Sequence, residues 1–203
     1  MKLHSSEINI KKASVALSDG SALENLPVHY DKKWTTVTLE LPKEVSPQSA
    51  KLSLEFDGTL NDKMRGFYRS SYKDAKGNEK FIASTQFEST YARLSFPCWD
   101  EPIYKATFDI SLVVDKNLTA LSNMNAVKET DEGTKRVVKY ATTPLMSTYL
   151  VAFAVGDLEY IEMNEFVCFN LEKNFKWMSD AIVYSAWEEG TGQVCLGTGN
   201  ESN

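Results

Sequence analysis

The chain has 203 residues, of which 42% are hydrophobic and 25% are charged. This is an ordinary globular composition, and the length allows one sizeable core or two small ones, so an intrinsically disordered chain is excluded. The formal net charge of -6 argues against a nucleic-acid partner or an anionic membrane partner, because both attract basic surfaces.

Cysteine usage and the first residues indicate the compartment. The three cysteines, Cys98, Cys168 and Cys195, are far apart and odd in number, so they match neither a metal knuckle nor a disulfide framework. The opening residues, MKLHSSEINIKK, contain no apolar signal-peptide core, and no run of 18 apolar residues follows. We therefore expect a cytoplasmic protein without a membrane partner.

Most of the chain, residues 1–161, is predicted to be β-structure. Apolar and polar residues alternate over 35–41, 51–56 and 107–114. A period of two is typical of antiparallel strands with one buried face. Residues 149–155 are apolar on both faces, which predicts a central strand covered on both sides.

Turn residues separate the predicted strands. Asp74 to Asn78 and Asp131 to Gly133 are predicted to be hairpin loops, the first with Gly77 at positive φ. Several short strands with turns between them favour an antiparallel β-sandwich or a saddle-like β-domain.

The pattern changes in residues 162–203. Leu171, Phe175, Met178 and Ile182 recur at helical spacing, which predicts a short C-terminal helix before Gly190. Such a helix covers an open part of the core or binds a partner, and the pattern fits both. The small polar residues that follow are predicted to be disordered.

The chain offers no hydrolytic zinc site. Such a site needs three protein ligands and a water, and a helix supplies two of the ligands as histidines in H-E-x-x-H. The only histidines are His4 and His29, and neither is followed by glutamate. We therefore expect no metal ligands, no catalytic residues and no cofactor in this chain.

One polar pair suits an ammonium ligand. In an extended strand Gln86 and Glu88 project to the same face while Phe87 points to the other. A carboxylate gives a charge-assisted acceptor for an amine, and an amide can orient it. A solvated pair at a sheet edge would have the same pattern, so the residues alone leave both interpretations open.

Six blocks in order are GTLNDKMRGFYRS, TQFEST, FPCWDEP, KATFDI, TALSNM and MSTYLVAF. In order and spacing they resemble the N-terminal domain of zinc aminopeptidases of the puromycin-sensitive and aminopeptidase N type, the family that includes leukotriene hydrolase. The resemblance extends from Phe56 to Glu159 and more weakly over 3–55. It implies that Gln86 and Glu88 hold the free α-amine of a peptide substrate, with zinc bound elsewhere in the full-length family.

The segment Phe96 to Pro102 has a structural role in that family, which implies that it packs the β-domain near the catalytic domain. We interpret Cys98 as a small packed residue rather than a nucleophile, since no histidine lies near it in the sequence. Arg93 is predicted to form a local ion pair. The family pattern usually has further charges beside it, where this chain has Tyr91 and Leu94.

The GAMEN peptide-binding loop, the H-E-x-x-H helix and the downstream glutamate ligand of the family are missing from these 203 residues. The resemblance leads us to expect a truncated N-terminal β-domain that lacks the family's first strands, with residues 162–203 as a divergent tail. Such a chain would bind a peptide N-terminus weakly and would not hydrolyse it alone. The alternative is a non-catalytic interaction module that binds a partner such as a full-length homologue.

Overall fold

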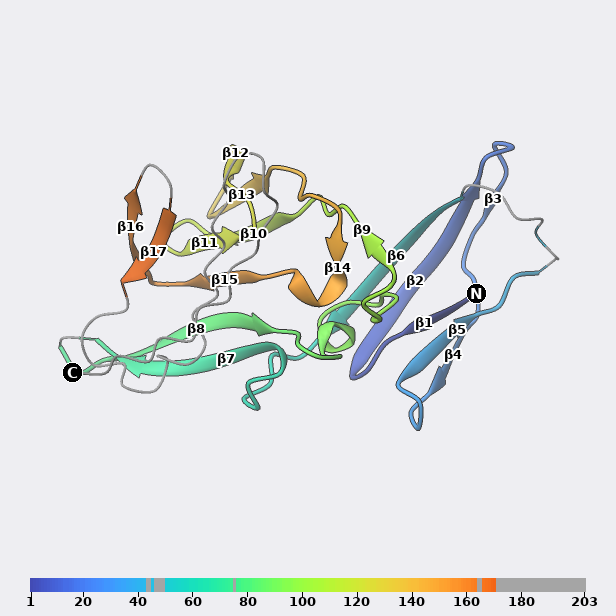
Figure 1. Ribbon diagram of the computed structural model, residues 1–203, viewed down its shortest axis with the longest axis horizontal. Helices are drawn as coiled ribbons and strands as arrows, with labels where there is room; N and C mark the ends of the chain where they lie inside the picture. Colours follow the sequence, from blue (N-terminus) through green and yellow to red (C-terminus); the bar gives the residue numbers. More distant parts are fainter. Residues whose placement is uncertain (43–44, 46–49, 75, 164–165, 171–203) are drawn as a thin grey trace. The chain divides into compact units, whose positions relative to one another are not determined.

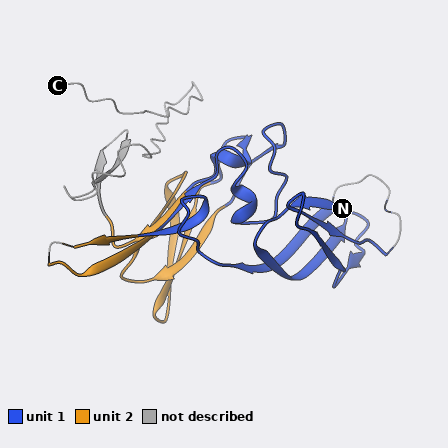
Figure 2. Ribbon diagram, turned by 90° about the horizontal axis from the view of Figure 1, so that it is seen from below, with its two compact units in different colours: residues 1–70, 83–109, 142–152 blue, residues 71–82, 110–141, 153–203 orange. Residues whose placement is uncertain are grey.

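The computed structural model describes residues 1–42, 45, 50–74, 76–163 and 166–170. These residues divide into two compact units, coloured separately in Figure 2. Unit 1 comprises residues 1–70, 83–109 and 142–152, and unit 2 takes the rest of the described chain. The fold is mainly β with antiparallel sheets, as predicted.

Two three-stranded sheets begin unit 1 (Figure 1). The first has the order β1-β5-β4 and the second β3-β2-β6. Their strands are β1 Lys2–His4, β2 Ile8–Leu17, β3 Ala22–Leu23, β4 Val28–Asp31, β5 Thr36–Leu39 and β6 Ala50–Gly58. One core cluster draws buried residues from both sheets, among them Leu3, Val15 and Leu39. The predicted strands at 35–41 and 51–56 correspond to β5 and β6.

A β-bulge keeps the apolar side chains of β2 on the core side. Ile8 and Ile10 are buried at one phase of the alternation, and Ala13, Val15 and Leu17 are buried at the other. The register against β6 shifts between Ile10 and Lys12. An extra residue in one strand changes which face the following side chains occupy, so the bulge explains how a ten-residue strand keeps its apolar side chains buried.

A four-stranded sheet has the order β11-β15-β8-β7, and β7 and β8 contribute residues to both units. Its strands are β7 Gly66–Lys73, β8 Glu79–Gln86, β11 Thr119–Ser122 and β15 Phe153–Gly156. The predicted hairpin loop connects β7 to β8, with Gly77 at a φ of 82° and Asp74 Oδ1 accepting from the amide N–H of Asn78.

Unit 2 also contains a three-stranded sheet of order β10-β13-β12. Its strands are β10 Ser111–Asp115, β12 Ala126–Glu132 and β13 Lys135–Tyr140. The hairpin loop between β12 and β13 has Gly133 at a φ of 62°, which confirms the second predicted turn. Val114 and Val138 of this sheet share a core cluster with Ala120 of β11.

Short elements complete the described chain. They are η1 Ala92–Leu94, β9 Lys105–Ala106, β14 Met146–Ser147, η2 Thr148–Leu150, β16 Glu159–Met163 and β17 Phe166–Asn170. The prediction of one strand over 149–155 is wrong in part, because η2 occupies its first residues and β15 begins at Phe153. The predicted helix from Leu171 onward lies outside the described residues.

Among the described residues, no helix is long and apolar enough to cross a membrane.

Candidate functional site

The predicted amine-binding pair lies at the end of β8. Gln86 is the last residue of the strand and is half-buried, whereas Glu88 is exposed in the connection that follows. Between them Phe87 is only 3% exposed and packs edge-on against Phe96, with ring centroids 5.9 Å apart. The alternation of exposure agrees with the predicted pattern, although the regular strand ends before Glu88.

The connection after Glu88 is a compact turn. The amide N–H of Tyr91 donates to the carbonyl of Phe87 at 2.8 Å, and η1 follows directly. The Arg65 guanidinium lies over the Tyr91 ring, 5.4 Å from its centroid. These contacts fix the backbone on the C-terminal side of Glu88, and they leave its carboxylate on the surface.

Gly66 allows the start of β7 to approach this turn. Its φ is +66°, and a Cβ atom there would lie 2.5 Å from the Cβ of Leu94. A side chain at this position would therefore be strained by the backbone conformation and would also clash with η1.

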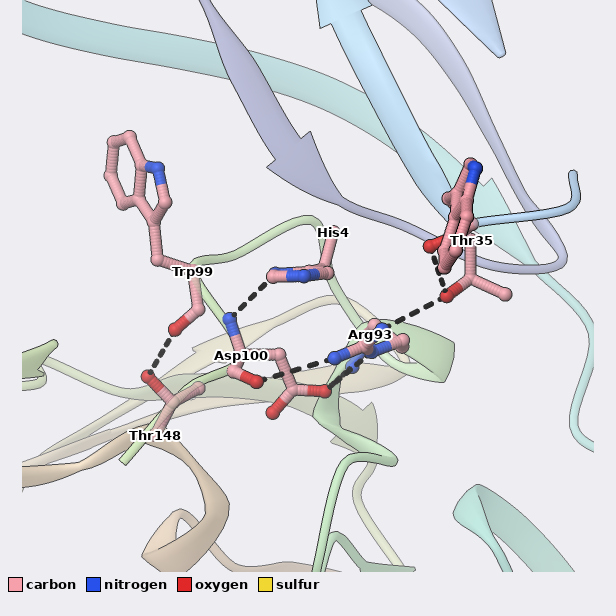
Figure 3. Close-up of polar contacts among 7 residues, drawn as sticks. His4, Thr35, Arg93, Trp99, Asp100 and Thr148 are labelled. Atoms are coloured by element: carbon pink, nitrogen blue, oxygen red, sulfur yellow. Dashed lines mark hydrogen bonds and ion pairs between the residues drawn. The ribbon is translucent and has the colours of Figure 1, made fainter. Parts of the chain in front are cut away.

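Arg93 of η1 forms a buried ion pair with Asp100. Arg93 Nε is 2.9 Å from Asp100 Oδ2, and the Asp100 side chain is 1% exposed. The Arg93 backbone N–H also donates to that carboxylate at 3.2 Å. Its guanidinium donates through Nη2 to the Asp100 carbonyl and through Nη1 to Thr35 Oγ1. Figure 3 shows the guanidinium between Asp100 and Thr35. The prediction of a local ion pair for Arg93 is confirmed.

His4 joins the same network, which the sequence did not predict. It pairs with Cys98 as an isolated antiparallel bridge, and its Nδ1 accepts from the amide N–H of Asp100 at 3.2 Å. The two residues of that hydrogen bond are separated by 96 positions. Residue spacing contains no signal for such a contact, because it depends on where β1 lies in the fold.

Cys98 is a packed residue, as interpreted from the sequence. Its thiol is free and buried, and burial together with the Asp100 carboxylate raises its pKa to about 12. No histidine lies near Cys98 along the sequence, but the fold places His4 beside it as its bridge partner. A thiol with such a raised pKa is a poor nucleophile at neutral pH.

Exposed apolar side chains flank Asp100 and precede the paired strands β9 and β14. Trp99, Ile103, Tyr104 and Leu145 are all exposed, and all belong to unit 1. In Figure 3 the Trp99 indole points away from the Arg93–Asp100 pair. The backbone beneath is held by Ser147 Oγ, which donates to the Pro102 carbonyl at 2.7 Å.

A zinc site needs several His, Cys, Asp or Glu side chains close together. Within the described part of the chain, no three such side chains group together as candidate metal ligands. Asp100, the most buried carboxylate, is already committed to Arg93. These residues therefore do not fit the zinc centre that the resemblance implies for the full-length family.

Known proteins resemble most of this chain. It is 56% identical over 163 residues to a puromycin-sensitive aminopeptidase from Caenorhabditis elegans, which covers 79% of this chain and 17% of that protein. It is 46% identical over 167 residues to aminopeptidase 2 from Candida albicans, covering 81% of this chain and 17% of the relative. For aminopeptidase M1 from Arabidopsis thaliana the identity is 43% over 163 residues, with coverages of 79% and 18%.

The chain thus spans less than a fifth of the length of these relatives. Residues 1–150 match the family of the peptidase M1 N-terminal domain, which is most of the 203 residues. The order of sequence blocks, the mainly β fold and these matches agree: the chain belongs to the peptidase M1 N-terminal domain family.

Proposed function

We propose that this chain supplies the part of an aminopeptidase that recognises the free amino terminus of a peptide, through Gln86 and Glu88. The observation that carries the proposal is the arrangement at the end of β8. Buried Phe87 anchors the backbone, Glu88 presents an exposed carboxylate, and Gln86 lies two residues before it. A carboxylate and an amide together satisfy an ammonium group by a charge-assisted hydrogen bond and a neutral one.

On its own the pair binds weakly. Exposed ion pairs contribute about 0–1 kcal/mol, because water screens them and ordering the side chains costs entropy. A dissociation constant of about 1 mM requires roughly 4 kcal/mol of net binding free energy. We therefore expect millimolar affinity or weaker for a peptide amino terminus, and no hydrolysis by this chain alone.

Hydrolysis is proposed to belong to a longer protein of this family. The zinc and the groups that act on the peptide bond would come from residues other than those described, whereas Gln86 and Glu88 would orient the substrate amine. A cytoplasmic location remains a prediction from the sequence.

An NMR titration of the 203-residue chain tests the amine-binding role. Alanine amide is the ligand, and N-acetylalanine amide, which has no ammonium group, is the matched control. We expect the amide signals of Gln86 and Glu88 to shift with alanine amide only. Glu88→Gln should remove the shift, while Glu24→Gln, at another exposed carboxylate of unit 1, should leave it unchanged. Equal shifts with both ligands would refute the proposal.

A hydrolysis assay tests the second part of the proposal. A fluorogenic aminopeptidase substrate with added zinc should give no turnover above buffer. Turnover that a chelator abolishes, and that persists through rigorous purification, would show that the chain is an enzyme by itself.

A second candidate function is an interaction module. It rests on the exposed apolar side chains of Ile103, Tyr104 and Leu145 beside the paired strands β9 and β14, together with exposed Trp99. Contiguous exposed apolar patches on soluble proteins mark interaction surfaces. The partner would be a full-length homologue of the same family. Size-exclusion chromatography of the mixed proteins should show co-elution, which Ile103→Asp should weaken. A chain that always elutes alone would count against this function.

A further inference from the structure

His4 attaches β1 to a segment almost one hundred residues away in the sequence. Its amide N–H donates to the Cys98 carbonyl at 2.8 Å, and the Cys98 amide N–H donates back to the His4 carbonyl at 3.1 Å. These two backbone hydrogen bonds make the main-chain part of the attachment. The imidazole adds a third, because Nδ1 accepts from the amide N–H of Asp100 at 3.2 Å.

The third hydrogen bond defines the protonation state of the ring. A neutral imidazole can accept at one nitrogen and donate at the other, whereas a protonated imidazole donates at both. An acceptor at Nδ1 therefore requires the neutral ring with its proton on Nε2. Protonation would replace the acceptor by a second N–H that faces the N–H of Asp100.

The charged groups around the ring do not compensate for such a change. Arg93 of η1 and Lys2 of β1 repel a positive charge on His4, while Asp100 and Glu101 attract it. The Asp100 carboxylate, however, is already held by two donors of Arg93, at 2.9 and 3.2 Å. The Cys98 thiol is neutral at the pH at which a histidine titrates, since its pKa is raised to about 12. Burial and then Arg93 are the main causes that lower the pKa of His4.

We propose that the His4 side chain forms a pH-sensitive hydrogen bond that helps to hold β1 against the segment Phe96 to Pro102. The neutral ring holds the segment through the Asp100 amide, and the protonated ring releases that hydrogen bond. This pH-sensitive contact is independent of amine recognition by Gln86 and Glu88, because it involves neither residue.

The sign of the pH dependence follows from the two protonation states. The folded chain binds the His4 proton less readily than the unfolded chain, whose imidazole has a pKa of about 6.5. The unfolded state therefore takes up more protons as the pH falls through about 6.5. Stability is lost over this window and levels off below the lowered pKa of the folded state. Each unit of difference between the two pKa values changes the unfolding equilibrium constant by about tenfold.

NMR titration of the imidazole carbons in the full chain tests the first step. We expect the midpoint for His4 to lie below its midpoint in the chain unfolded by urea. Exchange of the Asp100 amide proton should accelerate, relative to the amide protons of the β2–β6 ladder, as His4 becomes protonated. A midpoint at or above the unfolded value, or an exchange rate that does not follow the titration, would overturn the proposal.

Two substitutions test the consequence for stability. In His4→Asn the Oδ1 atom can accept from the Asp100 amide without titrating, and His29→Asn alters the other histidine, whose side chain is 62% exposed. Guanidinium unfolding at pH 7.5 and pH 5 should show that His4→Asn loses part of the acid sensitivity of the unchanged chain, while His29→Asn keeps it. Equal acid sensitivity in the unchanged chain and both variants would refute the proposed role of His4. If His4→Asn does not fold, the imidazole titration and the Asp100 exchange rate decide.

Discussion

Arg93 and Asp100 form an ion pair that is nearly closed to water: their side chains are 15% and 1% exposed, and Nε lies 2.9 Å from Oδ2. The guanidinium satisfies both the carboxylate and the carbonyl of Asp100, and it reaches Thr35 in a different part of unit 1. The pair therefore joins η1, the segment around Asp100 and the residue that precedes β5. We interpret the role of the pair as structural, since the Asp100 side chain is 1% exposed and its Oδ2 atom accepts from two donors of Arg93.

Removing one partner of the Arg93–Asp100 pair should lower the free energy of unfolding strongly. Asp100→Ala leaves the Arg93 guanidinium half-satisfied in a buried position, and breaking a buried pair costs about 3–5 kcal/mol of the free energy of unfolding. Guanidinium unfolding monitored by circular dichroism measures the effect. Asp57→Ala removes the surface pair with Lys11, in which both side chains are about half exposed, and should change little. A similar effect of both substitutions would contradict the role assigned to Asp100.

Two glycines with positive φ should respond differently to alanine. Gly66 and Gly77 have φ values of +66° and +82°, so each substitution incurs about 1–2 kcal/mol of backbone strain. A Cβ at Gly66 would also lie 2.5 Å from Leu94 Cβ, whereas nothing lies within 4 Å at Gly77. We expect Gly66→Ala to be more destabilising by about 1–3 kcal/mol, the usual cost of overpacking. Thermal unfolding of both variants gives the comparison.

The Cys98 thiol should resist alkylation in the folded chain. A pKa raised from 9.0 to about 12 lowers the thiolate fraction near pH 8 by about a thousandfold, and burial restricts access further. In a chain with Cys168 and Cys195 replaced by serine, iodoacetamide should modify Cys98 only after denaturant is added. Mass spectrometry over time measures the rate. Rapid modification of the folded chain would show that the segment around Cys98 opens readily.

Alanine substitutions at Leu39 and Leu145 should distinguish an effect on folding stability from an effect on association with a partner. Leu39 is 0% exposed in the core of unit 1, and Leu145 is 67% exposed. Leu39→Ala should cost about 2–5 kcal/mol of the free energy of unfolding, because it leaves a cavity among packed side chains. Leu145→Ala should leave the unfolding free energy almost unchanged and should reduce only co-elution with a full-length homologue. A strong loss of stability for Leu145→Ala would remove it from the proposed interaction surface.

The burial of Phe87 between the less buried Gln86 and Glu88 was readable in the sequence, because an apolar residue between polar ones predicts alternating faces in an extended backbone. The exposures of the three residues follow that pattern. Where the regular strand ends was not readable, since β8 stops at Gln86 by its hydrogen bonds to other strands. For the same reason residues 149–155, uniformly apolar, were predicted as one strand but contain η2 and the start of β15.

By itself the sequence determined the mainly β fold, the two hairpin loops with Gly77 and Gly133, and the absence of an H-E-x-x-H motif from these 203 residues. Each of these depends on local spacing or on a count of residues. Only the tertiary structure decided that His4 lies beside Cys98 and that its ring accepts from Asp100. The physical reason is that strand pairing brings together residues from distant parts of the chain, and no local pattern in β1 specifies its partner.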